Sequence, residues 1–240
     1  MSEHAERYTR LATRLASEGW QVAAHDHPGH GRSSGRRGVL ESPDELVDGA
    51  AQAIAAFASD TGAPPLMFAH SLGAVVATEL LARGDVPIAG LVLSAPAIVP
   101  RLSAMDRLKL SVLSTVAPSH ALEMPYDASR LTSDPDEIAA AHADALIHHR
   151  KSASLVRWLV DAAGRALKRA PEIDVPTFVL IAGSDFLIDT DRTREFVARL
   201  TPALVDWVIY DDYRHELLNE TPQRRERVTD DIVRWLDAHA

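Results

Sequence analysis

The hydrophobic and polar positions of the chain change their period from segment to segment. Short apolar runs predict strands over 20–26, 66–70, 88–96, 177–185 and 204–211. Amphipathic stretches with helical spacing predict helices over 5–18, 43–60, 72–83, 190–200 and 222–238. Apolar strands that alternate with helices are typical of a mostly parallel sheet with helices on both faces. We therefore predict a fold of the α/β class.

The stretch 97–172 departs from this alternation, because it has helical patterns but no convincing strand. It lies between two strands of the predicted sheet. An insertion at this place predicts a helical cap over the carboxyl edge of the sheet, where ligands bind in open α/β folds. We therefore predict one α/β core formed by residues 1–96 and 173–240, and a helical cap formed by residues 97–172.

A sharp strand-to-helix turn is predicted at Ala69-His70-Ser71-Leu72-Gly73, which differs from G-x-S-x-G only in its first residue. In that motif the serine hydroxyl stands above the sheet edge, and we expect crowding there to demand small residues at 69 and 73. The backbone N–H of Leu72, at the start of the helix, can stabilise an oxyanion. The alternative is a serine that only caps a helix. The position between a strand and a helix favours a nucleophile.

A serine nucleophile needs a histidine base and an acid that orients the histidine. In chains with this serine motif the order is serine, acid, histidine. Asp185 stands at the end of the predicted strand 177–185, and His215 follows the next strand. We therefore predict a catalytic triad of Ser71, Asp185 and His215.

Composition narrows the classes of function. The chain has no cysteine, which excludes disulfides, thiolate metal sites and a cysteine nucleophile. Its net charge of −9 comes from interspersed charges and argues against nucleic acid as a partner. We find neither a signal peptide nor a run of roughly 18 apolar residues that would span a membrane. We therefore expect a cytoplasmic enzyme.

Histidines are dense in the segment 25–30 (HDHPGH). Such density also occurs in metal sites, but no second cluster supplies an acidic partner. We expect neither a metal ion nor another cofactor. We expect His148 and His149, in a charged stretch with a helical pattern, to be solvated, and His70 to pack beneath the serine turn.

These motifs together resemble the monoacylglycerol lipase and lysophospholipase branch of the α/β-hydrolase superfamily. Residues 2–8 resemble the segment after that branch's His-Gly motif, residues 26–35 its D-x-x-G-H-G-x-S-x-G loop, and residues 215–220 its His-Glu-x-x-Asn-Glu segment. The resemblance implies the α/β-hydrolase fold and a carboxylic-ester hydrolase. Its substrate would be a small lipophilic ester with one acyl chain, cleaved through an acyl-enzyme on Ser71.

The resemblance also reveals a departure at the N-terminus. The branch's His-Gly would stand directly before Met1, so Met1 falls on the residue whose N–H completes the oxyanion hole with Leu72. The first strands of the sheet, including the strand between 20–26 and 66–70, have no counterpart in the sequence. We therefore expect the natural protein to begin upstream of Met1. The loss of one oxyanion donor would lower turnover by about 10²–10³.

Two other functions stay open: a catalytically weak or vestigial member of the fold, and an acyltransferase that uses the same triad. The apolar positions of the predicted cap either line a lid or pack the cap onto the sheet; they are Met105, Leu108, Leu110, Val112, Leu113, Val116 and Met124. A lid face would suit transient contact with a membrane or micelle surface. The sequence sets neither the acyl length, nor the headgroup, nor the oligomeric state.

Overall fold

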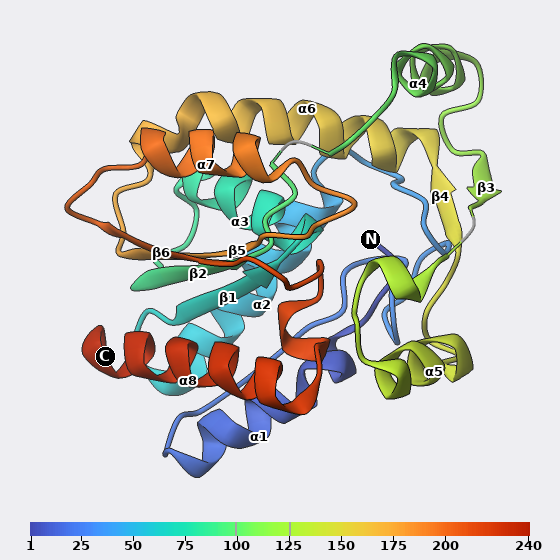
Figure 1. Ribbon diagram of the computed structural model, residues 1–240. Helices are drawn as coiled ribbons and strands as arrows, with labels where there is room; N and C mark the ends of the chain where they lie inside the picture. The colour runs from blue at the N-terminus through green and yellow to red at the C-terminus, as the bar shows by residue number, and fades with distance from the viewer. Residues whose placement is uncertain (99, 125) are drawn as a thin grey trace.

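A four-stranded parallel sheet forms the centre of the protein in the computed structural model, which describes residues 1–98, 100–124 and 126–240 (Figure 1). The strand order is β1-β2-β5-β6. The strands are β1 (Leu66–His70), β2 (Gly90–Ser94), β5 (Thr177–Ala182) and β6 (Val205–Tyr210). The two central strands are buried at every position, as expected of parallel strands covered on both faces. Four of the five predicted strands are therefore confirmed.

Helices cover both faces of the sheet (Figure 1). One apolar cluster joins the sheet to α2 (Glu45–Thr61), α3 (Leu72–Arg83), α6 (Ala153–Arg169) and α7 (Thr190–Arg199). A second cluster joins the other face to α1 (Thr9–Ser17) and α8 (Pro222–Ala238). The short helix η1 (Ala5–Tyr8) precedes α1, and η3 (Ala170–Glu172) follows α6. The predicted α/β class, with helices on both faces, is confirmed.

The prediction of a strand over 20–26 is wrong. This segment forms no strand pairing, and Val22 is 41% exposed. Within the described ranges β1 pairs only with β2, so β1 is an edge strand of the sheet. A strand needs a neighbour to take up its backbone N–H and C=O groups. Apolar composition alone therefore does not make this segment a strand.

The stretch 97–172 contains α4 (Ala104–Val116), η2 (Ala128–Arg130), α5 (Pro135–Ala143) and α6. It also contains the antiparallel pair of β3 (Ala121–Glu123) and β4 (Arg150–Ser152), so the prediction of no strand here is wrong. α4 projects away from the sheet and has no buried residue (Figure 1). The division into core and cap stays a prediction. Across the described ranges, every helix is too short or too polar to cross a membrane.

Candidate active site

Ser71 occupies a strained turn between β1 and α3. Its backbone angles are φ 52° and ψ −113°, and a positive φ is uncommon for a residue other than glycine. The N–H of Ser71 donates to the carbonyl of Ser94 on β2 at 3.0 Å, and the N–H of Ala97 donates to the carbonyl of Ser71 at 3.2 Å. The neighbouring strand end therefore fixes the turn that presents the serine at the carboxyl edge of the sheet.

Position 73, where a small residue is expected, has room for alanine as well as glycine. Outside its own helix backbone, a Cβ atom on Gly73 would meet only the Cβ of Ala69, at 4.0 Å. That is an ordinary van der Waals contact. Space at this turn therefore tolerates alanine at 73 as well as at 69.

The structure brings the three predicted triad residues together. His215 Nε2 lies 2.9 Å from Ser71 Oγ, and His215 Nδ1 lies 2.6 Å from Asp185 Oδ2. Both distances are those of hydrogen bonds. Asp185 and His215 are buried, at 8% and 3% exposure, while Ser71 is partly exposed. Each side chain follows a different strand, so the parallel sheet is what places them at one edge.

Asp185 uses both of its carboxylate oxygens. Oδ2 faces His215, and Oδ1 accepts hydrogen bonds from the N–H groups of Leu187 at 2.7 Å and Ile188 at 2.9 Å. Burial alone would raise the pKa of Asp185, but His215 and these two N–H groups outweigh it and hold the pKa below its ordinary value. The carboxylate is therefore ionised and fixed in orientation at neutral pH.

His70 contributes more than packing beneath the turn. Its ring centroid lies 4.9 Å from that of His215, and its Nδ1 lies 3.2 Å from Ser94 Oγ. Burial first, and the neighbouring His215 second, lower the pKa of His70 to about 3. His70 is therefore neutral at pH 7 and places no positive charge beside His215.

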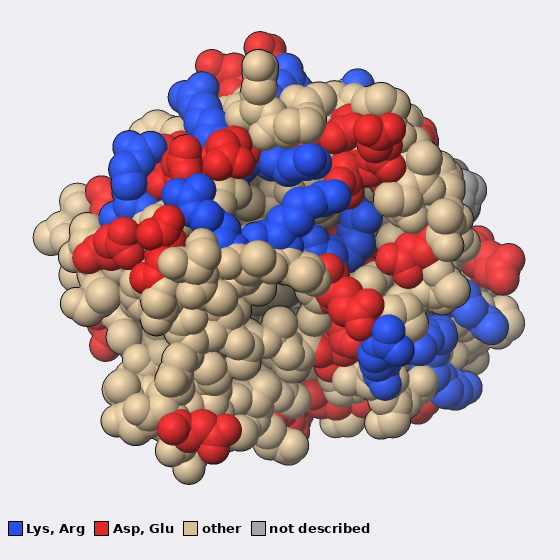
Figure 2. Space-filling model, turned by 90° about the horizontal axis from the view of Figure 1, so that it is seen from below, with Lys and Arg blue, Asp and Glu red and all other residues tan. Residues whose placement is uncertain are grey.

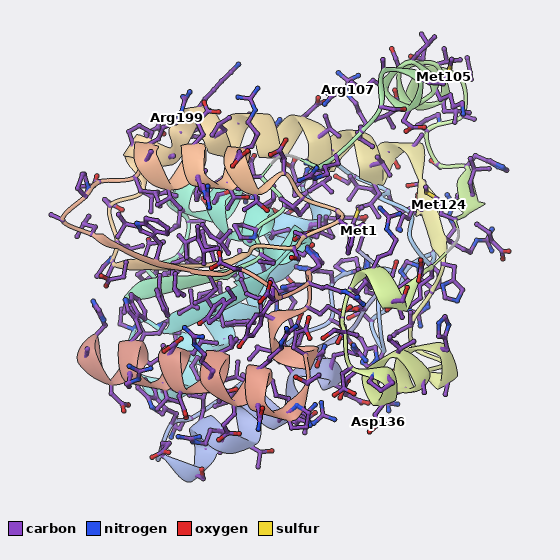
Figure 3. The ribbon with its side chains drawn as sticks, in the orientation of Figure 1. Met1, Met105, Arg107, Met124, Asp136 and Arg199 are labelled. Carbon is purple, nitrogen blue, oxygen red and sulfur yellow. The ribbon has the colours of Figure 1, made fainter. Side chains whose placement is uncertain are left out.

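The two predicted oxyanion positions lie in different settings. Leu72 is the first residue of α3, so its N–H has no partner four residues earlier in the helix. Met1 is partly buried and packs against the apolar cluster of α2, α3, α6 and α7 (Figure 3). The role of either backbone N–H in binding an oxyanion stays a prediction.

The histidines of segment 25–30 lie against a part of the chain that the sequence did not suggest. The ring of His30 lies 4.9 Å from that of His148, which is 8% exposed, so the expectation of a solvated His148 is wrong. Burial lowers the pKa of His30 to about 4 and that of His148 to about 3. Within the described ranges, no three His, Cys, Asp or Glu side chains are grouped as metal ligands would be.

Comparisons with known proteins agree with this geometry. Residues 1–222 match the family model Hydrolase_4, described as serine aminopeptidase, S33. A monoacylglycerol lipase of Mycolicibacterium smegmatis is 32% identical and aligns over 99% of this chain and 85% of its own length. The human monoglyceride lipase is 28% identical over 98% of this chain and 78% of its own length.

Solved structures share the fold over the whole chain. The crystal structure of the Paleococcus ferrophilus monoacylglycerol lipase has a TM-score of 0.89 and 28% identity, and the match covers 100% of this chain and 92% of that one. A soluble variant of the Saccharomyces cerevisiae monoglyceride lipase, in complex with a substrate analog, also has a TM-score of 0.89, at 19% identity. The chain belongs to the Hydrolase_4 (S33) family of α/β hydrolases, resembles its monoacylglycerol lipases and is a carboxylic-ester hydrolase.

Proposed function

We propose that this enzyme hydrolyses esters that carry a single acyl chain, such as monoacylglycerols or lysophospholipids, through an acyl-enzyme on Ser71. The observation that carries the proposal is the pair of hydrogen bonds on His215, 2.9 Å to Ser71 and 2.6 Å to Asp185. The substrate class is supported by relatives named monoacylglycerol lipase and by the phospholipase YtpA of Bacillus subtilis, which is 28% identical over 94% of this chain.

In this mechanism His215 Nε2 takes the proton of Ser71 as Oγ attacks the ester carbonyl. Asp185 keeps the other ring proton on Nδ1 and stabilises the imidazolium that forms. The N–H of Leu72 donates to the oxyanion, and Met1 stands at the position of the second donor. His215 then protonates the leaving alcohol. A water molecule, deprotonated by His215, attacks the acyl-enzyme, which releases the fatty acid and restores Ser71.

The exposed face of α4 supports capture of substrate from a micelle or membrane surface. Met105, Leu108, Val112 and Val116 recur at helical spacing and are 53–71% exposed. Arg107 stands on the same helix (Figure 3). Because α4 has no buried residue, these apolar positions are available to a lipid aggregate.

The decisive experiment labels the protein with a fluorophosphonate and maps the modified peptide. We expect the label on Ser71, and we expect it to be lost in Ser71→Ala and His215→Ala. The same variants should lose release of fatty acid from 1-monooleoylglycerol and lysophosphatidylcholine, each offered below and above its aggregation threshold. A label on another residue, or full activity in Ser71→Ala, would contradict the proposal.

Product analysis with added glycerol separates hydrolysis from acyl transfer. A hydrolase gives free fatty acid whatever the glycerol concentration, whereas an acyltransferase gives new glyceride. A folded protein that neither labels nor turns over any ester would instead be the vestigial member of the fold.

A further inference from the structure

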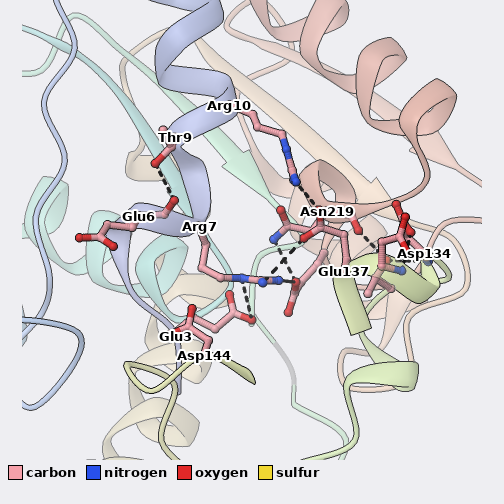
Figure 4. A network of polar contacts seen from close by, with 12 residues as sticks. Glu3, Glu6, Arg7, Thr9, Arg10, Asp134, Glu137, Asp144 and Asn219 are labelled. Carbon is pink, nitrogen blue, oxygen red and sulfur yellow. Dashed lines mark hydrogen bonds and ion pairs between the residues drawn. The ribbon is translucent and has the colours of Figure 1, made fainter. Parts of the chain in front are cut away.

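Arg7, in the short helix η1, carries a buried guanidinium that contacts its own N-terminal segment and two distant parts of the chain (Figure 4). The side chain is 7% exposed. Its Nη2 lies 2.5 Å from Oε2 of Glu216, its Nη1 lies 3.8 Å from Oε2 of Glu137, and its Nε lies 4.0 Å from Oε1 of Glu3. A guanidinium taken out of water is tolerated only where anions and hydrogen-bond acceptors surround it. Arg7 is therefore the centre of an ion cluster and not a surface charge.

Glu216 connects this cluster to the proposed catalytic base, because it directly follows His215 in the chain. It is 3% exposed. The same oxygen that faces Arg7 accepts a hydrogen bond from Asn219 Nδ2 at 3.0 Å, and the N–H of Glu216 donates to the carbonyl of Leu131 at 2.8 Å. Both the side chain and the backbone of the residue after His215 are thus fixed.

Glu137 connects the cluster to the first turn of α5. Three arginines converge on its carboxylate: Arg7, Arg10 at 2.5 Å and Arg225 at 3.4 Å. Glu137 is 5% exposed. Arg10 differs from Arg7 in two respects that matter for a test, since its side chain is 59% exposed and it has no ion pair with Glu216.

The charge states of the cluster follow from its packing. Burial first, and the nearby Glu216 second, raise the pKa of Glu3 well above its ordinary value. Burial alone would raise the pKa of Glu216, but hydrogen bonds from Glu3 and Asn219 and the charge of Arg7 outweigh it and hold the pKa low. Arg7 therefore faces an ionised Glu216, and among the residues that the structure describes Arg7 alone forms an ion pair with that carboxylate.

A cleft beside Arg7, between α1 and α8, does not offer a simpler explanation such as an anion site. Arg10, Arg14 and Arg225 line it, but each is already paired with carboxylates. Figure 2, which views the molecule from the side of α1 and α8, shows acidic and basic side chains mixed on this face. The carboxylates that pair with these arginines offset their positive charge, so the cleft offers no unpaired cation to a free anion.

We propose that Arg7 is a positioning residue for ester hydrolysis. By binding Glu216 and Glu137 together, it holds the His215 segment against the start of α5 and keeps the imidazole within hydrogen-bonding distance of Ser71. The proposal rests on the proposed role of His215 as the base. The positioning role of Arg7 predicts an effect on the chemical step more than on substrate binding, because Arg7 acts on His215 through the neighbouring residue Glu216.

The test compares Arg7→Met with the matched control Arg10→Met, because both remove one arginine from Glu137 and only the first removes the partner of Glu216. The substrate is a soluble p-nitrophenyl butyrate, and kcat is normalised to the number of serines that a fluorophosphonate labels at completion. We expect Arg7→Met to lower kcat and the labelling rate by about 10²-fold, the scale of a small misplacement of a catalytic group. KM should stay within about threefold, and Arg10→Met should match the wild type.

Glu216→Gln keeps the shape of the side chain but removes its charge, so it carries the test if Arg7→Met does not fold. It should lower kcat in the same direction with little change in KM. Three results would each overturn the proposal. The first is a wild-type kcat in Arg7→Met or Glu216→Gln, and the second is an effect confined to KM. The third is an equal loss of kcat in Arg7→Met and Arg10→Met. Ser71→Ala in the same assay separates the positioning role of Arg7 from the proposed function. An active Ser71→Ala enzyme would refute the proposed function, whatever the result for Arg7→Met.

Discussion

Replacing Asp185 with asparagine tests how His215, the proposed base, is held in the tautomer that can accept a proton from Ser71. Oδ1 of Asp185 accepts the N–H groups of Leu187 and Ile188, at 2.7 and 2.9 Å, while Oδ2 faces His215 Nδ1 at 2.6 Å. An asparagine has one oxygen and one NH2 group. The two backbone N–H groups require the oxygen at the Oδ1 position, so the NH2 group is forced to face Nδ1 of His215.

The consequence is a change of tautomer. Nδ1 must then accept a hydrogen bond, so the ring proton moves to Nε2, which faces Ser71 at 2.9 Å. A protonated Nε2 cannot take the proton of the serine. The corresponding change in the well-studied chymotrypsin triad lowers kcat about 10⁴-fold. We expect a loss of that order here, which corresponds to about 5 kcal/mol of transition-state stabilisation.

Asp185→Ala is the informative companion, because it removes the acceptor of both backbone N–H groups. Each N–H left without a partner costs about 1–3 kcal/mol, so Asp185→Ala should lower the melting temperature more than Asp185→Asn. It leaves His215 free to adopt either tautomer, however, so its kcat per folded molecule should be at least that of Asp185→Asn.

The assay is kcat on a soluble ester, normalised to folded protein, with melting temperatures from scanning fluorimetry. An Asp185→Asn enzyme within about tenfold of the wild type would refute the tautomer argument. So would an Asp185→Asn enzyme that is more active per folded molecule than Asp185→Ala.

Two further predictions concern stability. Gly73→Ala should leave the urea midpoint and activity near wild type. The Cβ of Gly183→Ala would lie 2.5 Å from backbone atoms of Asp211, so this variant should lower the free energy of unfolding by about 1–3 kcal/mol in the same urea experiment. Burial holds the pKa values of His30 and His148 below 6.5, so below that pH the unfolded chain binds more protons than the folded chain. The free energy of unfolding should therefore fall as the pH drops from 6.5 toward 4. The fall is up to about 1.4 kcal/mol per pH unit for each histidine. Urea midpoints across that range should fall less steeply in a His30→Asn, His148→Asn double variant, and an unchanged slope would contradict this account.

Local patterns predicted the elements well where the cause of an element is local. The strand over 66–70 and the helices over 72–83 and 222–238 have the bounds that the sequence indicated. A run of apolar residues and a change of period are properties of neighbouring residues. The proximity of Ser71, Asp185 and His215 could likewise be predicted, because parallel strands bring their carboxyl ends to one edge.

Features that depend on distant partners could not be predicted. Segment 20–26 has the composition of a strand, and composition predicts one there although no described strand pairs with it. His148 occupies a polar stretch of sequence, yet it is buried against His30. In both cases the outcome is decided by a neighbour from another part of the chain, which periodicity does not detect.

The segment 215–220 shows what the structure adds to a sequence motif. The family pattern includes its two acidic residues, Glu216 and Glu220, but gives no physical reason for them. Glu220 is fully buried, accepts the backbone N–H of Arg214 at 2.9 Å and hydrogen bonds to Ser133, while Glu216 pairs with Arg7. Glu220 therefore ties the His215 segment to Ser133, just before α5, and Glu216 ties it to Arg7 in η1. The two acidic residues of the motif thus anchor the segment that carries the His215 imidazole at two separate points.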